Sequence, residues 1–197
     1  MFATASPRRV ELAKKLDCVK NGRITPVFAP SNVNEVSLDG KDRAARTARA
    51  NARLKAEHAA KTHDAPVIAF DTVVGIGDEV LGKPTNKADA LRMFKLLCGN
   101  THSVITAVCI IANGKVYEDG ETTFVTFGAF DPVVTDRYIE SGAPFDKAGG
   151  YNIADAELAP IVSSVIGGID NVVGMPLTLS EKLIEENILY GEARNSH

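Results

Sequence analysis

The fold is decided by residues 65–77, which read APVIAFDTVVGIG. The apolar run from Val67 to Phe70 is typical of a strand that is buried on both faces. It leads directly into Asp71. The sequence therefore predicts a central strand whose apolar part ends at a carboxylate, where ligands of open α/β sheets bind.

The segments before this strand alternate between predicted strands and helices. Residues 1–4 form a short predicted strand, after which Ser6 is a helix N-cap and Pro7 occupies the first helical position. A second short strand is expected over residues 24–29. Residues 41–61 are rich in alanine and arginine, which predicts one long helix.

The same alternation continues after the central strand. Asn86 caps a predicted helix through Leu97, and residues 102–130 predict strands with an Asn113-Gly114 hairpin turn of type I′. Asp131-Pro132 begins a predicted helix that runs to residue 141. A short strand over residues 161–166 and a glycine-rich turn then lead to a final helix.

This order of elements predicts an α/β fold with a mixed sheet. The 197 residues, of which 45% are hydrophobic and 24% charged, can form one well-buried core or two small domains. We expect a single domain over residues 1–197, with two lobes around a cleft. The formal net charge of -3 argues against general binding of duplex nucleic acid, so any anion site must be local.

Cysteine usage fits a reducing compartment, and hydropathy gives no sign of a membrane segment. The three cysteines are widely spaced and form no CxxC pair, so we expect them to be small buried apolar residues. No basic-plus-apolar leader and no apolar run near 18 residues occurs. We therefore expect a cytoplasmic protein with no membrane partner.

The loop ASPRR, residues 5–9, is the first candidate site. A strand that runs into a helix N-terminus presents free N–H groups to phosphate, and Ser6, Arg8 and Arg9 add a hydroxyl and two guanidinium groups. Cations cost a few tenths of a kcal/mol at this end of a helix, and a bound polyphosphate would reverse that cost. The alternative is a solvated helix start whose arginines pair with acids such as Glu11.

Carboxylates and lysines form the other candidates. Asp71 can bind a divalent metal or accept a proton from water, or else cap the turn that follows it. Glu35 can share that metal, or be a solvated loop acid. Lys83 lies in a short hairpin that can return to the same place. Asp146 and Lys147 precede two glycines, where the alternative is an exposed ion pair on a turn.

Several common sites are excluded. The chain has no GxxxxGK[ST], no GxGxxG and no GxSxG, and its four histidines lack metal-ligand spacing. Chemistry at the candidate residues would therefore depend on carboxylates, cations and a metal.

Six strings follow one another over nearly the whole chain: ATASPRRVEL, FDTVV, GKP, THSVITAV, DKAGGYNI and IDNVVGMPL. In this order they resemble those of the Maf family of nucleoside triphosphate pyrophosphatases. The resemblance implies a Maf/ITPase-like fold, with an elongated mixed sheet flanked by helices and a cleft between two lobes. It also implies a homodimer and a reaction that splits a nucleoside triphosphate into the monophosphate and pyrophosphate with Mg2+ or Mn2+.

The resemblance also implies roles for individual residues. Asp71 corresponds to the proton acceptor, and Glu35, in the string VNE, corresponds to the acid that joins it at the metal. Arg8 and Thr72 match positions linked to substrate choice in the dTTP/UTP branch. The matches on the phosphate-binding side of the cleft are Ser6, Arg9 and Lys83, and Lys147 lines the same cleft.

Two departures concern the substrate and the helix of residues 41–61. The dTTP/UTP branch usually has glutamine in KAGxYGIQ, whereas Ala154 stands at that place and cannot make the amide's hydrogen bonds. Many members carry a lysine in AREKA; the nearest match, ARANA, places Asn51 there, and Lys55 follows one helical turn later.

The implied substrates are dTTP, UTP or modified pyrimidine nucleotides. The alternatives are a purine-directed pyrophosphatase that acts on ITP or XTP, and a nucleotide-binding regulator of septum formation.

Overall fold

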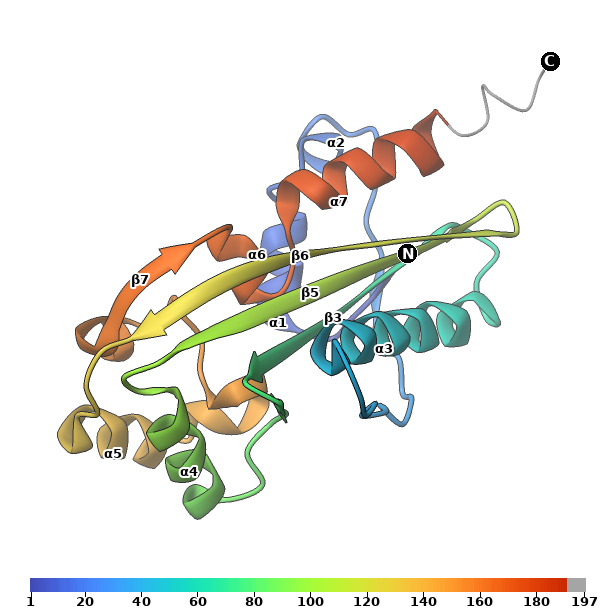
Figure 1. Ribbon diagram of the computed structural model, residues 1–197. Helices are drawn as coiled ribbons and strands as arrows, with labels where there is room; N and C mark the ends of the chain where they lie inside the picture. The colour runs from blue at the N-terminus through green and yellow to red at the C-terminus, as the bar shows by residue number, and fades with distance from the viewer. Residues whose placement is uncertain (191–197) are drawn as a thin grey trace.

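The computed structural model describes residues 1–190 and contains a seven-stranded sheet (Figure 1). The strand order is β2-β1-β3-β5-β6-β7, and β4 pairs with β3 beside this path. The strands are β1 (Phe2–Ala3), β2 (Phe28–Ala29), β3 (Val67–Ile76), β4 (Glu79–Leu81), β5 (Thr101–Ala112), β6 (Lys115–Phe127) and β7 (Val162–Ile166).

Seven α-helices surround this sheet in the described residues. They are α1 (Pro7–Ala13), α2 (Asp17–Lys20), α3 (Arg43–Ala60), α4 (Lys87–Leu97), α5 (Pro132–Glu140), α6 (Ile169–Val173) and α7 (Leu177–Ile184). Shorter helical turns are η1 (Ala143–Asp146), η2 (Ala148–Gly150), η3 (Ala156–Ile161) and η4 (Glu185–Leu189). The predicted long helices are confirmed, whereas no sequence pattern predicts α2 and α6.

Local hydrogen bonds explain where the predicted helices begin. The side chains of Ser6, Asn86 and Asp131 each accept a backbone N–H from the first turn of the helix that follows. Asn113 and Gly114 both have positive φ, as a type I′ hairpin turn requires. These signals act over a few residues, so the sequence alone can locate them.

The sheet is mixed, as predicted. β1 runs parallel to β2 and β3, and the other pairs of neighbouring strands are antiparallel. The strand expected over residues 24–29 is shorter than predicted, because only Phe28 and Ala29 pair with β1.

One edge of β3 is incompletely paired. β5 pairs with β3 from Val67 to Gly75. On the other edge of β3, pairing with β1 ends at Ile68, and pairing with β4 covers only Val74 to Ile76. Among the described residues, positions 69–73 therefore have no strand partner on that edge. Asp71 follows the apolar run, but the expected place at the carboxyl end of the strand is wrong, because β3 continues to Ile76 and Asp71 lies beside this gap.

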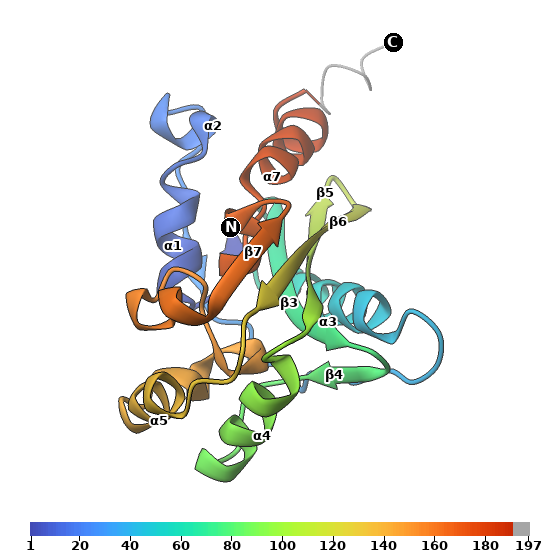
Figure 2. The same cartoon turned by 60° about the vertical axis from the view of Figure 1, so that its left-hand side comes forward.

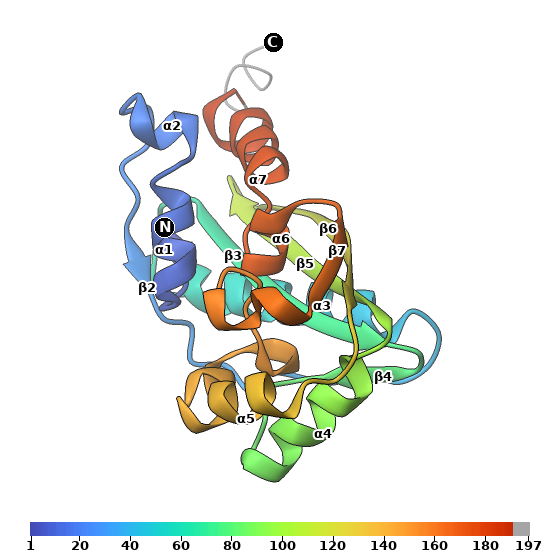
Figure 3. The ribbon, with the colours of Figure 1, turned by 90° about the vertical axis from the view of Figure 1, so that its left-hand side faces the viewer.

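The alternation of side chains along β3 divides its residues between two helical layers. One face packs against α3 and carries Val67, Ala69 and Val73. The other face packs against α1 and α7 and carries Ile68 and Phe70. Figures 2 and 3 show α3 and α1 on opposite sides of the sheet. The Asp71 side chain thus lies on the face of the sheet that packs against α3, and the Thr72 side chain lies on the face that packs against α1.

The core separates into regions that correspond to the two predicted lobes. The two clusters just described cover the sheet near β1. A third cluster packs α4 and α5 against the other end of β3, β5 and β6, and includes Phe94, Phe127 and Tyr138. Figure 3 shows α4 and α5 together at that end, away from α2 and α7.

Two further expectations concern the described residues. The three cysteines are free and buried, as predicted. No helix in residues 1–190 combines the length and apolar character that crossing a membrane requires. The single domain predicted over residues 1–197 stays a prediction, and its last seven residues lie outside the described part.

We expect Gly149→Ala to destabilise the protein more than Gly114→Ala. Both glycines have positive φ, which costs an L-residue about 1–2 kcal/mol. A Cβ on Gly114 would meet only open space, whereas a Cβ on Gly149 would lie 2.9 Å from Cγ2 of Val74. Overpacking adds about 1–3 kcal/mol to the loss of unfolding free energy for Gly149→Ala. Urea unfolding of both variants checks this, and equal losses would contradict it.

Candidate active site

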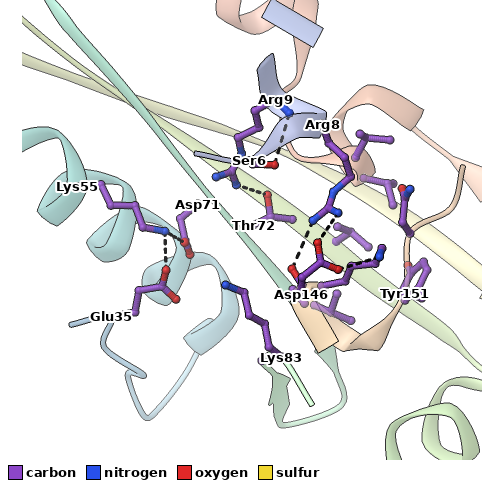
Figure 4. Close-up of a pocket in the computed structure, with 18 residues that line it drawn as sticks. Ser6, Arg8, Arg9, Glu35, Lys55, Asp71, Thr72, Lys83, Asp146 and Tyr151 are labelled. Carbon is purple, nitrogen blue, oxygen red and sulfur yellow. Dashed lines mark hydrogen bonds and ion pairs between the residues drawn. The ribbon is translucent and has the colours of Figure 1, made fainter. Parts of the chain in front are cut away.

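A pocket occupies the gap beside β3 and collects residues that are far apart in the chain (Figure 4). The exit of β1 contributes Ser6, Arg8 and Arg9, and β3 contributes Asp71 and Thr72. The remaining polar lining comes from Glu35, Lys55, Lys83, Asp146, Lys147, Tyr151 and Asn152. All sequence-predicted site residues except Ala154 therefore line one pocket.

Lys55 joins the two predicted metal ligands. Its Nζ lies 2.5 Å from Oδ1 of Asp71 and 2.7 Å from Oε1 of Glu35. The Asp71 side chain is 7% exposed and that of Lys55 is 11% exposed, whereas Glu35 is half exposed. A buried carboxylate and a loop carboxylate thus share one ammonium group.

The two carboxylates differ in protonation behaviour. Burial raises the pKa of Asp71 above its usual range, although Lys55 and Arg9 oppose this effect. Burial alone would also raise the pKa of Glu35, but Lys55, Lys83 and Arg9 outweigh it and the pKa falls below its usual range. Asp71 is therefore the better proton acceptor near neutral pH, and Glu35 stays ionised.

Lys55 is a site residue that the sequence motifs did not assign. The string ARANA aligns Asn51 with the family's lysine. Residues 52–56 read ARLKA, which matches AREKA at four of five positions and places Lys55 at the lysine. That second match is the signal that could have identified it.

Arg9 is half-buried between α1, β3 and the segment after α6. Its Nε donates to the Gly174 carbonyl (2.8 Å) and one terminal nitrogen donates to Oγ1 of Thr72 (3.0 Å). The guanidinium also lies 5.9 Å from the centre of the Phe70 ring. Burial lowers the pKa of Arg9, and the nearby Asp71 carboxylate opposes this.

The hydroxyl of Thr72 is fully used in hydrogen bonds within the protein. Thr106 donates its hydroxyl proton to the Asn171 carbonyl, so in the 2.9 Å contact between the two threonines Thr72 is the donor. Thr72 therefore accepts from Arg9 and donates to Thr106. Its hydroxyl orients Arg9 and has no proton left for a ligand.

Arg8 has a carboxylate partner on the other lobe. Nη1 of Arg8 lies 2.8 Å from Oδ2 of Asp146, and Asp146 also binds Lys147 at 2.8 Å. Glu11, the partner of the arginines in the alternative interpretation, pairs with Lys14 instead. The expected exposed ion pair between Asp146 and Lys147 exists, but the Lys147 side chain is 10% exposed and lines the pocket.

Side chains provide most of the positive charge of the pocket. α1 has only seven residues, and Oγ of Ser6 already accepts the Arg9 N–H, so the helix N-terminus contributes less than expected. Five basic and three acidic side chains line the pocket. Figure 4 shows the Lys83 ammonium pointing toward Asp71 and Glu35. A local excess of positive charge therefore exists in a chain of net negative charge.

Ala154 lies outside this pocket and is exposed. Asn152, two residues earlier, lines the pocket in its place, and its amide donates to Oδ1 of Asp155 (2.7 Å). The turn therefore brings an amide to the pocket, but from a position that the sequence did not predict.

The pocket residues fit a metal that binds together with a phosphate. Glu35 and Asp71 each keep one carboxylate oxygen that does not contact Lys55. Mg2+ is commonly held by one or two carboxylates together with substrate phosphates and water. Within residues 1–190, no three His, Cys, Asp or Glu side chains are close enough to hold a metal alone. Glu35 and Asp71 meet at one ammonium group and fit this role, whereas Asp146, the third carboxylate of the pocket, is paired with Arg8 and Lys147.

Known proteins resemble the chain over nearly its whole length. The family model described as "Maf-like protein" matches residues 1–187. A dTTP/UTP pyrophosphatase of Pyrococcus furiosus is 37% identical over 94% of this chain and 93% of its own length. One of Bordetella pertussis is 38% identical over 89% of this chain and 86% of its own.

A solved structure overlaps the chain more distantly. The nucleoside-triphosphatase, or dITP/XTP pyrophosphatase, of Mycobacterium abscessus has a TM-score of 0.43 and 13% identity. The overlap covers 66% of this chain and 74% of that chain.

We expect Asp71→Asn to raise the free energy of unfolding at pH 7. Because the pKa of Asp71 is raised, the folded protein holds this proton more tightly than the unfolded chain, and ionisation of Asp71 reduces stability. The gain should shrink as the pH falls through the folded-state pKa, since the wild-type side chain then becomes neutral as well.

Urea unfolding at several pH values measures this gain. The control is Asp64→Asn, because Asp64 is exposed and has no side-chain hydrogen bond or ion pair within the described residues. A lower stability of Asp71→Asn at pH 7 would show that the pair with Lys55 outweighs the cost of burial.

Proposed function

The chain belongs to the Maf family, and on this premise we propose that it hydrolyses nucleoside triphosphates to the monophosphate and pyrophosphate. The names of the relatives support dTTP, UTP or modified pyrimidine nucleotides as substrates. The observation that carries the proposal is the Glu35–Lys55–Asp71 cluster, which lies in the same pocket as a group of cations.

The cations account for binding of the triphosphate. Arg9 is held rigidly by Gly174 and Thr72, so little conformational entropy is lost when it binds an anion. Lys83 and Lys147 are point charges on the facing side of the pocket. The free-state partner of Arg8 is Asp146, and a phosphate would replace that carboxylate with another anion.

Asp71 accounts for activation of water. Its raised pKa makes it a stronger base than an ordinary aspartate, while Lys55 and Arg9 limit that rise because their positive charge stabilises the ionised form. In this mechanism Asp71 accepts a proton from water while the water oxygen bonds to the α-phosphorus. The bond from that phosphorus to the bridging oxygen breaks, and pyrophosphate leaves.

The divalent cation is part of the same proposal. Mg2+ or Mn2+, held by Glu35 and Asp71 with the substrate, supplies neutralisation of the phosphate charge. Glu35 is suited to this role because its pKa is lowered and it stays ionised. Lys55 keeps both carboxylates in place and balances their charge in the free protein.

The experiment is a substrate panel with purified protein and Mg2+. Pyrimidine triphosphates, ITP and XTP are compared by following pyrophosphate and monophosphate. We expect Asp71→Asn to lower kcat about 10²–10⁴-fold, because loss of a proton acceptor has an effect of this size. Asp64→Asn serves as the exposed control.

The products distinguish the alternatives. Release of orthophosphate would contradict the proposed bond cleavage, and faster turnover of ITP or XTP would favour the purine-directed enzyme. Binding without turnover across the panel would favour a nucleotide-binding regulator. Normal turnover by folded Asp71→Asn would show that Asp71 is not the base.

We expect Arg8→Ala to raise KM for the triphosphate about tenfold or more, since hydrogen bonds to charged groups contribute ~1.5–3 kcal/mol. Steady-state kinetics on dTTP, UTP and ITP test this and show whether the change depends on the base. Lys14→Ala is the matched control, because it removes one exposed cation near α1 whose only ion pair within residues 1–190 is with Glu11. Equal kinetics of Arg8→Ala and wild type on every nucleotide would exclude a role for Arg8 in binding.

A further inference from the structure

α3 carries a row of buried polar side chains that the proposed mechanism uses only in part. Thr47, Asn51 and Lys55 are four residues apart, which places them on one side of the helix. Beside them lies a row of alanines that packs on the sheet, formed by Ala48, Ala52, Ala56 and Ala59. We call the first row the polar row of α3.

The polar row binds residues 35–38, a segment without regular secondary structure. Oγ1 of Thr47 accepts the Leu38 N–H at 3.0 Å, and Oδ1 of Asn51 accepts the Val36 N–H at 2.8 Å. Nδ2 of Asn51 also donates to the Val36 carbonyl at 3.1 Å. Helix side chains thus take the place of a neighbouring strand for this part of the backbone.

Asn51 makes one bond that Thr47 does not. Its Nδ2 lies 3.4 Å from Oδ2 of Asp71, on the oxygen opposite the one that binds Lys55. Both N–H groups of the amide and its oxygen are therefore in use. The Asn51 side chain is almost fully buried, and an asparagine is unfavourable inside a helix. These three hydrogen bonds therefore offset the cost of placing an asparagine there.

The bonds of Asn51 join the two carboxylates of the pocket. Val36 follows Glu35 directly, so fixing both backbone polar groups of Val36 limits where the Glu35 carboxylate can lie. The third bond, from Nδ2 of Asn51 to Oδ2 of Asp71, links the position of Glu35 to that of Asp71. Lys55 attracts both carboxylates, but an ammonium on a flexible chain imposes little direction.

We infer that Asn51 is a positioning residue that sets the distance and orientation of Glu35 relative to Asp71. The inference rests on the proposed function, because it assigns Asn51 to the same reaction. It concerns kcat rather than affinity, since Asn51 does not line the pocket. A displacement of about 1 Å at reacting groups can lower a rate about 100-fold.

The test compares Asn51→Leu with Thr47→Val. Leucine and valine approximate the shapes of the residues they replace and remove the hydrogen bonds, and both variants free part of the same segment. For Asn51→Leu we expect kcat to fall about 10- to 100-fold with KM within about threefold of wild type. For Thr47→Val we expect kcat within about threefold of wild type.

A second readout does not require turnover. Hydrogen exchange of the peptide over residues 34–39 should be faster in Asn51→Leu than in wild type, since the Val36 N–H loses its acceptor. Thr47→Val should accelerate exchange of Leu38 in the same peptide. An unchanged kcat in Asn51→Leu, or equal losses of kcat in the two variants, would overturn the inference.

Two provisions keep the test decisive. If circular dichroism shows that Asn51→Leu does not fold, Asn51→Ser replaces it, because serine is polar but too short to reach both Val36 and Asp71. A kcat of Asn51→Ser within threefold of wild type would then overturn the inference.

If wild-type protein hydrolyses no triphosphate, the proposed function fails. Exchange of residues 34–39 then decides the placement of the segment, and unchanged exchange in the Asn51 variant overturns it.

Discussion

The site depends on an unfilled place in the sheet. β3 needs a neighbour on each edge, but β1 ends after Ala3 and β4 ends at Leu81, opposite Val74, so within residues 1–190 positions 69–73 are left open on one side. The chain leaves β1 toward Arg8 and Arg9, and leaves β4 toward Lys83. Both exits meet at the open edge, and side chains from both faces of β3 can reach it.

The second requirement is the close approach of α3. Alanines on its inner side allow the helix backbone to lie near the sheet, and this brings Lys55 onto the Asp71 carboxylate. A larger residue at Ala52 would push the helix outward and lengthen that contact. The same row of small residues that packs the core therefore controls the electrostatics of the pocket.

Sequence reasoning locates features that depend on neighbours in the chain, such as the helix starts at Ser6 and Asn86, because each cap bonds to its own helix. Long-range contacts are harder to predict. The position of Asp71 inside β3 depends on which strands pair beyond it, and the choice between Asn51 and Lys55 depends on how α3 is rotated over the sheet. The placement of Ala154 outside the pocket likewise depends on the turn after Asn152, whose side-chain oxygen accepts the Ala154 N–H, and no periodic pattern reveals that turn.

The open edge of β3 also bears on self-association. The Ile68 N–H points toward β1, so by the alternation along the strand the backbone N–H and C=O groups of Phe70 and Thr72 point into the gap. Such groups are a template for a foreign strand. The charged side chains of Arg9, Lys55 and Asp71 surround that template, and an incoming apolar strand would cover these charges without pairing them. The residues that we assign to phosphate chemistry thereby also protect this open stretch of β3 against pairing with a foreign strand.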